Sequence, residues 1–268
     1  MIADRLPASR GDAADIRPAT ILDELEAGRV RAAEPDPSAP SGWRARPDVK
    51  AAILALFADP TPASWQVGPF AFHDRAAFGP IDPGPDRRIV PGGSAVRAGA
   101  HLEPGVVVMP PSYVNVGAWV GTNTMIDSHV LVGSCAQIGS GVHLAAGVTI
   151  GGVLEPPGAR PVIVEDGAFV GAGSRLLDGV LVRRGAVIAA GVILTGTSRL
   201  YDVEEELEWQ GTVEEPLIVP PDVVVVPGSR ALAGAWAEAR GLSVSTAIIV
   251  KRRDAGTAAR VALEDALR

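Results

Sequence analysis

Residues 96–150 read VRAGAHLEPGVVVMPPSYVNVGAWVGTNTMIDSHVLVGSCAQIGSGVHLAAGVTI, and every sixth residue of this stretch is aliphatic. The series extends back to position 90 and has no exception: Val90, Val96, Leu102, Val108, Val114, Val120, Ile126, Val132, Ile138, Leu144 and Ile150. The residue four places after each of the first ten is small or β-branched, from Ser94 to Val148. Two positions in every six are therefore constrained.

A period of six matches neither the 3.6-residue repeat of a helix nor the alternation of a simple strand. It indicates a repeat unit made of one short strand and one turn. The aliphatic side chain of each unit then points inward and stacks on its counterpart one coil further on, and glycines suit the tight corners. The repeat predicts a mainly β protein built as a parallel β-helix with three-sided coils.

The repeat is interrupted once, after Ile150. The segment GGVLEPPGARP follows, and the aliphatic series resumes at Val164, two residues out of phase, and continues to Leu200. We read this as one loop inserted over about 151–163, in a β-helix that ends near residue 203. Three parts are therefore expected, namely an N-terminal helical domain, the β-helix and a small C-terminal extension of strands and a helix: 1–87, 88–203 and 204–268.

Helical patterns precede the β-helix. Residues 20–34 place apolar side chains on one face, with Thr20 as N-cap, and residues 47–59 do the same with Pro47 in the first turn. A loop is expected between them, over 35–42. After the β-helix we expect two strands and a closing amphipathic helix: 223–229, 245–253 and 257–268.

Composition and charge exclude several classes of protein. The net charge of −7 has the wrong sign for a protein that binds nucleic acid or an anionic membrane surface. The single cysteine, Cys135, cannot form an internal disulfide, and the first residues show no apolar leader. No run of about 18 apolar residues is present, so we expect no membrane span. The chain is predicted to be a cytoplasmic protein.

Several motifs resemble the tetrahydrodipicolinate N-succinyltransferases of lysine and diaminopimelate biosynthesis, a family of hexapeptide-repeat acyltransferases. They are RIVPG, MPPSYVNVGAWV, TMID, VGSCAQIG, VHLAAGVTIGGVLEP, VIVEDGAFVGA, LYDVE, VPPDVVVVPGS and AIIVKRRDAGTAARVALEDALR, from about residue 88 to the end. The resemblance implies a left-handed coil, a homotrimer and an active site in the cleft between neighbouring β-helices. It also implies transfer of a succinyl group from succinyl-CoA, or of another acyl group from its CoA ester, to a small-molecule amine that carries carboxylates.

Two residues match functional positions of the family. Arg88, which opens RIVPG, corresponds to an arginine that binds a substrate carboxylate, and a guanidinium suits this because it donates two parallel hydrogen bonds. Asp127, the aspartate of TMID, corresponds to the proposed catalytic and substrate-binding aspartate. Amide formation needs a neutral amine, which a nearby carboxylate can orient and deprotonate. The alternatives are a surface arginine that caps the first coil and an aspartate that caps a corner.

Two other positions depart from the family. Arg175 stands in GAGSRLLDG where relatives carry a glutamate that works with the aspartate, so a carboxylate has become a cation. The phase of the repeat places Asp127 and Arg175 on different sides of the coil, where they would meet only across a subunit interface. His129 replaces a bulky tryptophan two residues from Asp127. We expect the two to share the face of a strand, with His129 as a substitute general base or a polar surface residue.

Basic residues near the C-terminus suggest contacts to the coenzyme. Lys251 and Arg252 match a basic pair of the family and are candidates for binding the phosphates of coenzyme A, or solvated residues at a strand end. No metal is expected. A β-helix enzyme of the γ-carbonic anhydrase kind needs three converging histidines, and this spacing is lacking in the four that the chain has: His73, His101, His129 and His143.

Three functions stay open at this point. The first is the N-succinyltransferase of the lysine pathway. The second is a paralogue with an altered acceptor or acyl donor in specialised metabolism, which the changes at His129 and Arg175 favour. The third is a non-catalytic β-helix scaffold, which the absence of the glutamate permits.

Overall fold

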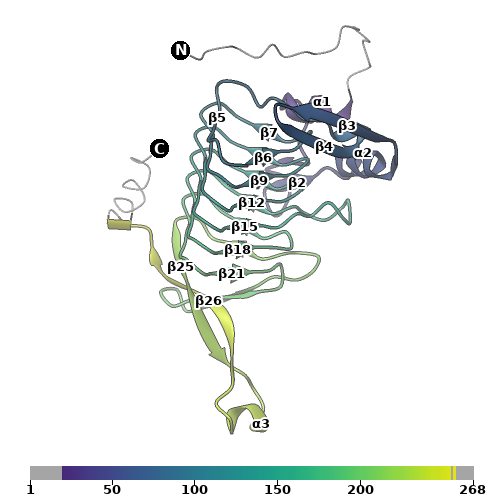
Figure 1. Ribbon diagram of the computed structural model, residues 1–268. Coiled ribbons are helices and arrows are strands. Elements are labelled where there is room, and N and C mark those ends of the chain that lie inside the picture. The colour runs from purple at the N-terminus through teal and green to yellow at the C-terminus, as the bar shows by residue number, and fades with distance from the viewer. Residues whose placement is uncertain (1–19, 255, 258–268) are drawn as a thin grey trace.

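The fold is a stack of short parallel strands, seen in a computed structural model that describes residues 20–254, 256 and 257 (Figure 1). Consecutive strands join three sheets in turn, which we call face 1, face 2 and face 3. Face 1 contains β5 (Arg88–Ile89), β8 (Val107–Val108), β11 (Met125–Ile126), β14 (His143–Leu144), β17 (Phe169–Val170), β20 (Val187–Ile188) and β25 (Val223–Ala231). Face 2 contains β6 (Ala95–Val96), β9 (Tyr113–Val114), β12 (Leu131–Val132), β15 (Thr149–Ile150), β18 (Arg175–Leu176) and β21 (Ile193–Leu194). Face 3 contains β7 (His101–Leu102), β10 (Trp119–Val120), β13 (Gln137–Ile138), β16 (Ile163–Val164), β19 (Leu181–Val182) and β24 (Ile218–Val219).

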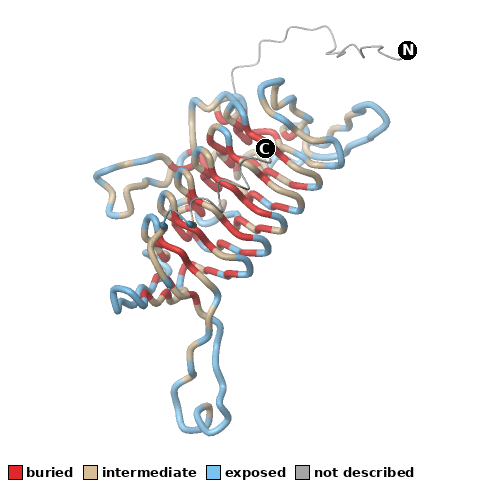
Figure 2. Tube along the Cα trace, turned by 90° about the vertical axis from the view of Figure 1, so that its left-hand side faces the viewer, coloured by how far each residue is buried: buried red, intermediate tan, exposed pale blue. Residues whose placement is uncertain are grey.

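The register shows that three hexapeptides make one coil. Trp119 pairs with Gln137, its neighbour 18 residues further on, and the second residue of each strand points into the coil. The predicted aliphatic residues from Leu102 to Leu200 are buried there and form one continuous core (Figure 2). The predicted start at Val90 is wrong, because Ile89 is the residue that pairs with Val108. The first coil holds one extra residue.

Buried hydroxyl groups connect successive coils. The Ser112 hydroxyl donates to the Asp127 carbonyl (2.7 Å) and accepts from the Val130 N–H (3.0 Å). Thr124, two hexapeptides further on, and Ser174, three coils further on, do the same, each with the residues 15 and 18 places ahead. A buried polar group is stable only when it is hydrogen-bonded. Some of the small residues just before the strands therefore carry a hydroxyl, which bonds a main-chain carbonyl and a main-chain N–H of the next coil.

The expected insertion between the two series is confirmed. Gln137 pairs with Ile163 rather than with a residue 18 places on, so the segment between β15 and β16 adds eight residues to this coil. The loop projects from the stack. Its Ala159 carbonyl accepts a hydrogen bond from the ammonium of the buried Lys50 (2.7 Å). Beyond it, the strands resume in the same rotation around the three faces.

The stack continues beyond residue 203. A hairpin of β22 (Arg199–Asp202) and β23 (Leu207–Gln210) comes first, and then β24 and the start of β25 add strands to face 3 and face 1. The two strands expected in the C-terminal part are confirmed as β25 and β26 (Ser243–Arg252), with a short helix α3 (Ala235–Glu238) between them. Their far end extends away from the coil and is exposed (Figures 1 and 2). The helix expected over 257–268 lies outside the described residues except for Thr257.

The N-terminal part is mixed rather than helical. Its helices are α1 (Ile21–Glu26), α2 (Pro47–Ala58) and the one-turn 3₁₀ helix η1 (Ala76–Phe78), and its hairpins are β1 (Ala33–Pro35) with β2 (Trp43–Ala45) and β3 (Pro62–Val67) with β4 (Phe70–Arg75). Thr20 caps α1 as predicted. The helix is much shorter than the expected 20–34, because Gly28 adopts a positive φ of 71° and the chain turns away. Among the described residues no helix is long and apolar enough to cross a membrane.

The N-terminal part covers face 3. Arg31 stacks on the Trp119 ring (4.1 Å to the centroid) and donates to the Gln137 side chain (2.9 Å). Burial lowers the pKa of Arg31 to about 10. The His101 ring contacts the Glu26 carbonyl (2.7 Å). Face 3 is therefore occupied by the chain's own N-terminal part, whereas the outward residues Leu131, Arg175 and Ile193 of face 2 are exposed among the described residues.

Candidate active site

Arg88 lies on the outside of face 1 at the start of the coil. It is the first residue of β5, and because Ile89 packs inward, the Arg88 side chain points away from the core and is exposed. No described residue forms a hydrogen bond or ion pair with its guanidinium. The predicted carboxylate-binding group is therefore available for a ligand.

Asp127 lies on the same face, at the end of β11. Arg88 pairs with Val107 and Val107 with Met125, so the two site residues are two strand spacings apart along the coil, about 10 Å. The main chain of Asp127 is held on both sides, because its N–H donates to Leu144 (2.9 Å) and its carbonyl accepts from Ser112 (2.7 Å). This fixes the position of the carboxyl group.

The Asp127 carboxylate keeps one oxygen for a ligand. Oδ1 accepts from the Ser128 N–H (2.6 Å), and no described residue donates to Oδ2. The side chain is half-buried. A carboxylate oriented by a main-chain donor and open on one oxygen can accept a proton from a bound amine.

His129 does not share a strand face with Asp127, and this expectation is corrected. Strand β11 ends at Ile126, and His129 lies in the following turn with a positive φ of 61°. Its N–H donates to the Pro111 carbonyl (2.7 Å), and its side chain is exposed at the corner between faces 1 and 2. The rule that residues two apart point the same way holds only while the chain stays extended.

Arg175 lies on face 2, as the first residue of β18. It pairs with Thr149 on one side and Ile193 on the other, and its side chain is exposed. The predicted separation of Asp127 and Arg175 onto different sides of the coil is confirmed. No described residue is bonded to the Arg175 guanidinium.

Lys251 and Arg252, at the end of β26, already have partners in the chain. Lys251 pairs with the exposed Asp254. Arg252 donates to Asp202 (2.7 Å), whose side chain is only 1% exposed. Burial by itself would raise the pKa of Asp202, but the hydrogen bonds from Arg252 and from two N–H groups in the next turn hold that pKa below its usual value. Arg252 is therefore part of a structural ion pair.

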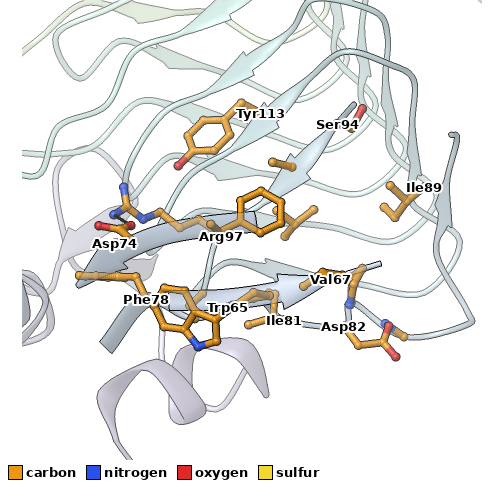
Figure 3. A pocket seen from close by; sticks show the side chains of 18 of the residues that line it. Trp65, Val67, Asp74, Phe78, Ile81, Asp82, Ile89, Ser94, Arg97 and Tyr113 are labelled. Atoms are coloured by element: carbon orange, nitrogen blue, oxygen red, sulfur yellow. Dashed lines mark hydrogen bonds and ion pairs between the residues drawn. The ribbon is translucent and has the colours of Figure 1, made fainter. Parts of the chain in front are cut away.

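A large cavity contains none of the predicted site residues. It has a volume of about 710 Å³ and lies between the β3–β4 hairpin and the first coils. Figure 3 shows Trp65, Val67 and Phe78 on one wall and Ile89 and Tyr113 on the other.

An ion pair lies at the edge of this cavity, where Arg97 donates to Asp74 (3.1 Å) and stacks on the Phe78 ring (4.5 Å to the centroid). The hairpin that forms one wall was not predicted from the sequence. The Gly68–Pro69 turn between two apolar runs is the signal that would have indicated it.

The four histidines occupy separate places. His73 is on the β3–β4 hairpin, His101 on face 3, His129 at a corner and His143 on face 1. Within residues 20–254, 256 and 257, no group of three or more histidine, cysteine, aspartate or glutamate side chains is arranged to hold a metal ion.

Comparison with known proteins finds relatives that share one name. A family model described as "Hexapeptide repeat of succinyl-transferase" matches residues 161–196. A curated protein of Rhodospirillum rubrum, named 2,3,4,5-tetrahydropyridine-2,6-dicarboxylate N-succinyltransferase, is 41% identical over 256 residues, which cover 92% of this chain and 87% of the relative. A protein of the same name from Idiomarina loihiensis is 41% identical over 262 residues, which cover 95% and 90%.

Among solved structures, the acetyltransferase domain of PglB from Neisseria gonorrhoeae in complex with acetyl coenzyme A is 19% identical to this chain. The superposition has a TM-score of 0.35 and covers 49% of this chain and 53% of that one.

Proposed function

The chain belongs to the 2,3,4,5-tetrahydropyridine-2,6-dicarboxylate N-succinyltransferase family, and we propose that it transfers a succinyl group from succinyl-CoA to an amine of a dicarboxylate acceptor. The observation that carries the proposal is the identity of 41% to curated relatives over more than nine-tenths of the chain. The hexapeptide repeat and the free groups at Arg88 and Asp127 support it.

We assign the proton transfer to Asp127. The amine nitrogen attacks the thioester carbonyl carbon, a C–N bond forms, and the C–S bond breaks to release the thiolate of coenzyme A. The proton that the nitrogen loses passes to Oδ2 of Asp127 and then to the thiolate, which regenerates the carboxylate. The anchored main chain of Asp127 supports this role, since a general base must be held within hydrogen-bond reach of the nitrogen.

Arg88 is the proposed partner of an acceptor carboxylate. Its guanidinium is exposed on the same face as Asp127, about 10 Å away along the coil, and it has no bonded partner in the described part of the chain. A dicarboxylate held at one end by Arg88 would present its other end toward Asp127. Arg175 is proposed as a second carboxylate contact, contributed from the face 2 of a neighbouring subunit.

His129 and the basic pair are further candidates. The exposed imidazole of His129 lies at the turn that follows Asp127, so it is a candidate second base. Lys251 and Arg252 are candidates for the phosphates of coenzyme A. Arg252 would have to leave a buried carboxylate to serve this role, whereas Lys251 would leave an exposed one.

The assembly and the location follow from the family resemblance. We propose a left-handed coil, three parts (1–87, 88–203 and 204–268) of which the third adds β24 and the start of β25 to the β-helix, a homotrimer with a shared site, a cytoplasmic enzyme and a reaction without a metal. The exposed residues Leu131, Arg175 and Ile193 of face 2 support a shared site, because face 3 is covered by the chain's own N-terminal part.

The test is steady-state kinetics of thiol release from succinyl-CoA with tetrahydrodipicolinate as acceptor. Asp127→Asn keeps the shape of the side chain but removes the base, and we expect kcat to fall about 100- to 10,000-fold. Asp178→Asn is the matched control, because Asp178 is exposed at another corner of the coil, and its kcat should be unchanged.

The variant His129→Gln separates the two candidate bases. An Asp127→Asn enzyme that keeps its kcat while His129→Gln loses it would move the proton transfer to the histidine. Turnover with another amino dicarboxylate but none with tetrahydrodipicolinate would identify a paralogue with a changed acceptor. If the protein neither turns over any acceptor nor binds any acyl-CoA, the non-catalytic β-helix scaffold is the function that remains.

A further inference from the structure

The turn that carries Asp127 is closed differently from several other turns of the coil. In those turns the N–H of the fourth residue donates to the carbonyl of the first, as Val148 does to Ala145 in the next coil (3.2 Å). In the turn 127–130, the Val130 N–H donates to the Ser112 hydroxyl instead (3.0 Å), and this hydroxyl donates to the Asp127 carbonyl (2.7 Å). The Ser112 side chain is therefore inserted into the bond that would otherwise close the turn.

Ser112 is itself held firmly. Its side chain is only 5% exposed, and its N–H donates to the Ser94 hydroxyl (3.1 Å), which in turn donates to the Met109 carbonyl (3.2 Å). Two successive turns at this corner are thus bridged by a hydroxyl group from the preceding coil. A hydroxyl has a single proton to donate, so the bond to the Asp127 carbonyl also fixes the rotation of the Ser112 side chain.

The bond from Ser112 reaches the carboxylate through one peptide group. The Asp127 carbonyl and the Ser128 N–H belong to the same planar peptide unit. This N–H donates to Oδ1 of the Asp127 side chain (2.6 Å). By holding the carbonyl on one side of the plane, the Ser112 hydroxyl therefore sets the direction of the donor that orients the carboxylate on the other side.

Removing the hydroxyl would leave two main-chain groups inside the coil without a partner, which folded proteins avoid. We expect the Val130 N–H and the Asp127 carbonyl to bond to each other instead, as their counterparts in the turn 145–148 do. The peptide plane between Asp127 and Ser128 would then rotate and take the carboxylate with it. A displacement of about 1 Å at a reacting group can lower a rate about 100-fold.

We propose that Ser112 is a positioning residue of the acyl transfer, which keeps the turn 127–130 open so that Oδ2 of Asp127 is directed at the acceptor amine. The inference rests on the proposed function, in which Asp127 is the base. Ser112 acts through Asp127 alone, because its hydroxyl is buried inside the coil and bonded on both sides by main chain.

Two variants of the full-length protein that differ only by a hydroxyl and a methyl group test the proposal. These are Ser112→Thr and Ser112→Val, and a β-branched side chain fits because Val130 occupies the same position of the repeat in the next coil. In steady-state thiol release we expect Ser112→Val to lower kcat about 10- to 100-fold, with the KM for succinyl-CoA unchanged. Ser112→Thr should keep the kcat of the wild type.

Thr124→Val is the matched control. The Thr124 hydroxyl forms the same two bonds in the turn 139–142, which carries none of the candidate site residues. We expect Thr124→Val and Ser112→Val to lower the melting temperature by similar amounts, but only Ser112→Val to lower kcat. An equal loss of kcat in both, or a Ser112→Thr enzyme as slow as Ser112→Val, would assign the effect to packing and overturn the proposal.

Crystal structures of wild type and Ser112→Val decide the orienting role without turnover. The expected result is a Val130 N–H bonded to the Asp127 carbonyl and a carboxylate turned away from its wild-type direction. An Asp127 side chain that keeps its direction in Ser112→Val overturns the proposal. A wild type that transfers no succinyl group, together with a carboxylate that turns in Ser112→Val, contradicts the proposed function alone.

Discussion

Asp202 shows how one buried carboxylate fixes the C-terminal strand. Its side chain is almost fully buried, and it accepts from Arg252 on β26 and from two N–H groups of the turn that follows it. From the sequence, Arg252 was a candidate for binding the coenzyme because it matches a basic pair of the family. The partner could not be predicted, since it lies 50 residues away and contacts Arg252 only because β22 and β26 are adjacent.

Replacing Asp202 tests this role. Asp202→Asn should lower the free energy of unfolding by about 1 to 3 kcal/mol at neutral pH, the range for a hydrogen bond to a charged group. Urea titration followed by circular dichroism measures it. Asp254→Asn, which removes the exposed partner of Lys251, is the control, and its effect should be clearly smaller.

The effect of Asp202→Asn should depend on pH with a definite sign. The pKa of Asp202 is lower in the folded chain than the usual 3.8. Its stabilisation is therefore fully present above the pKa of the unfolded chain and is lost as the pH falls through the lower, folded value. The difference between wild type and Asp202→Asn should shrink below about pH 3.8; a difference that grows in acid would contradict the ion pair.

The strands of the coil were largely predictable, because the inward side chains repeat without exception. The predicted insertion, the N-cap Thr20 and the strands β25 and β26 are also confirmed. Two local details were not predictable. The first coil contains an extra residue near Gly92 and Gly93, and both have positive φ. Helix α1 ends early because the chain turns at Gly28, where a Cβ would lie 2.7 Å from the His101 ring of face 3.

Glycines at the ends of strands test how closely the coils pack. A Cβ at Gly171 would lie 2.4 Å from the Ala190 main-chain nitrogen of the next coil, and main chain cannot move aside easily. Gly171→Ala should therefore destabilise the fold by about 1 to 3 kcal/mol, as overpacking does. Gly158→Ala is the matched control in the inserted loop, where nothing lies within 4 Å, and thermal unfolding compares the two. Equal melting temperatures would show that the coils are not in close contact there.

At the scale of the molecule, the candidate site residues lie on two different faces of the β-helix. Arg88 and Asp127 lie on face 1, and Arg175 lies on face 2. The family motifs singled out Arg88 and Asp127, and the phase of the repeat predicted that Asp127 and Arg175 lie on different sides of the β-helix. The sequence could not predict the cavity beside the β3–β4 hairpin, because this cavity forms between the coils and a hairpin that precedes them in the chain.

The conformation of His129 shows the same limit. His129 does follow Asp127 by two residues, but a shared face would require an extended chain. The chain turns at His129 instead, so the two side chains do not share a strand face. Side-chain direction at a corner depends on backbone angles that a six-residue repeat does not specify.

The most direct measurement follows the acyl group itself. The full-length protein is incubated with succinyl-CoA labelled with ¹³C in the succinyl carbons and with tetrahydrodipicolinate, and the products are identified by mass spectrometry and carbon NMR. We predict that the label appears in an amide of the acceptor, with one free thiol of coenzyme A released for each amide formed. Label that is recovered only as free succinate, or that stays in the thioester while the acceptor is unchanged, would contradict N-succinyl transfer.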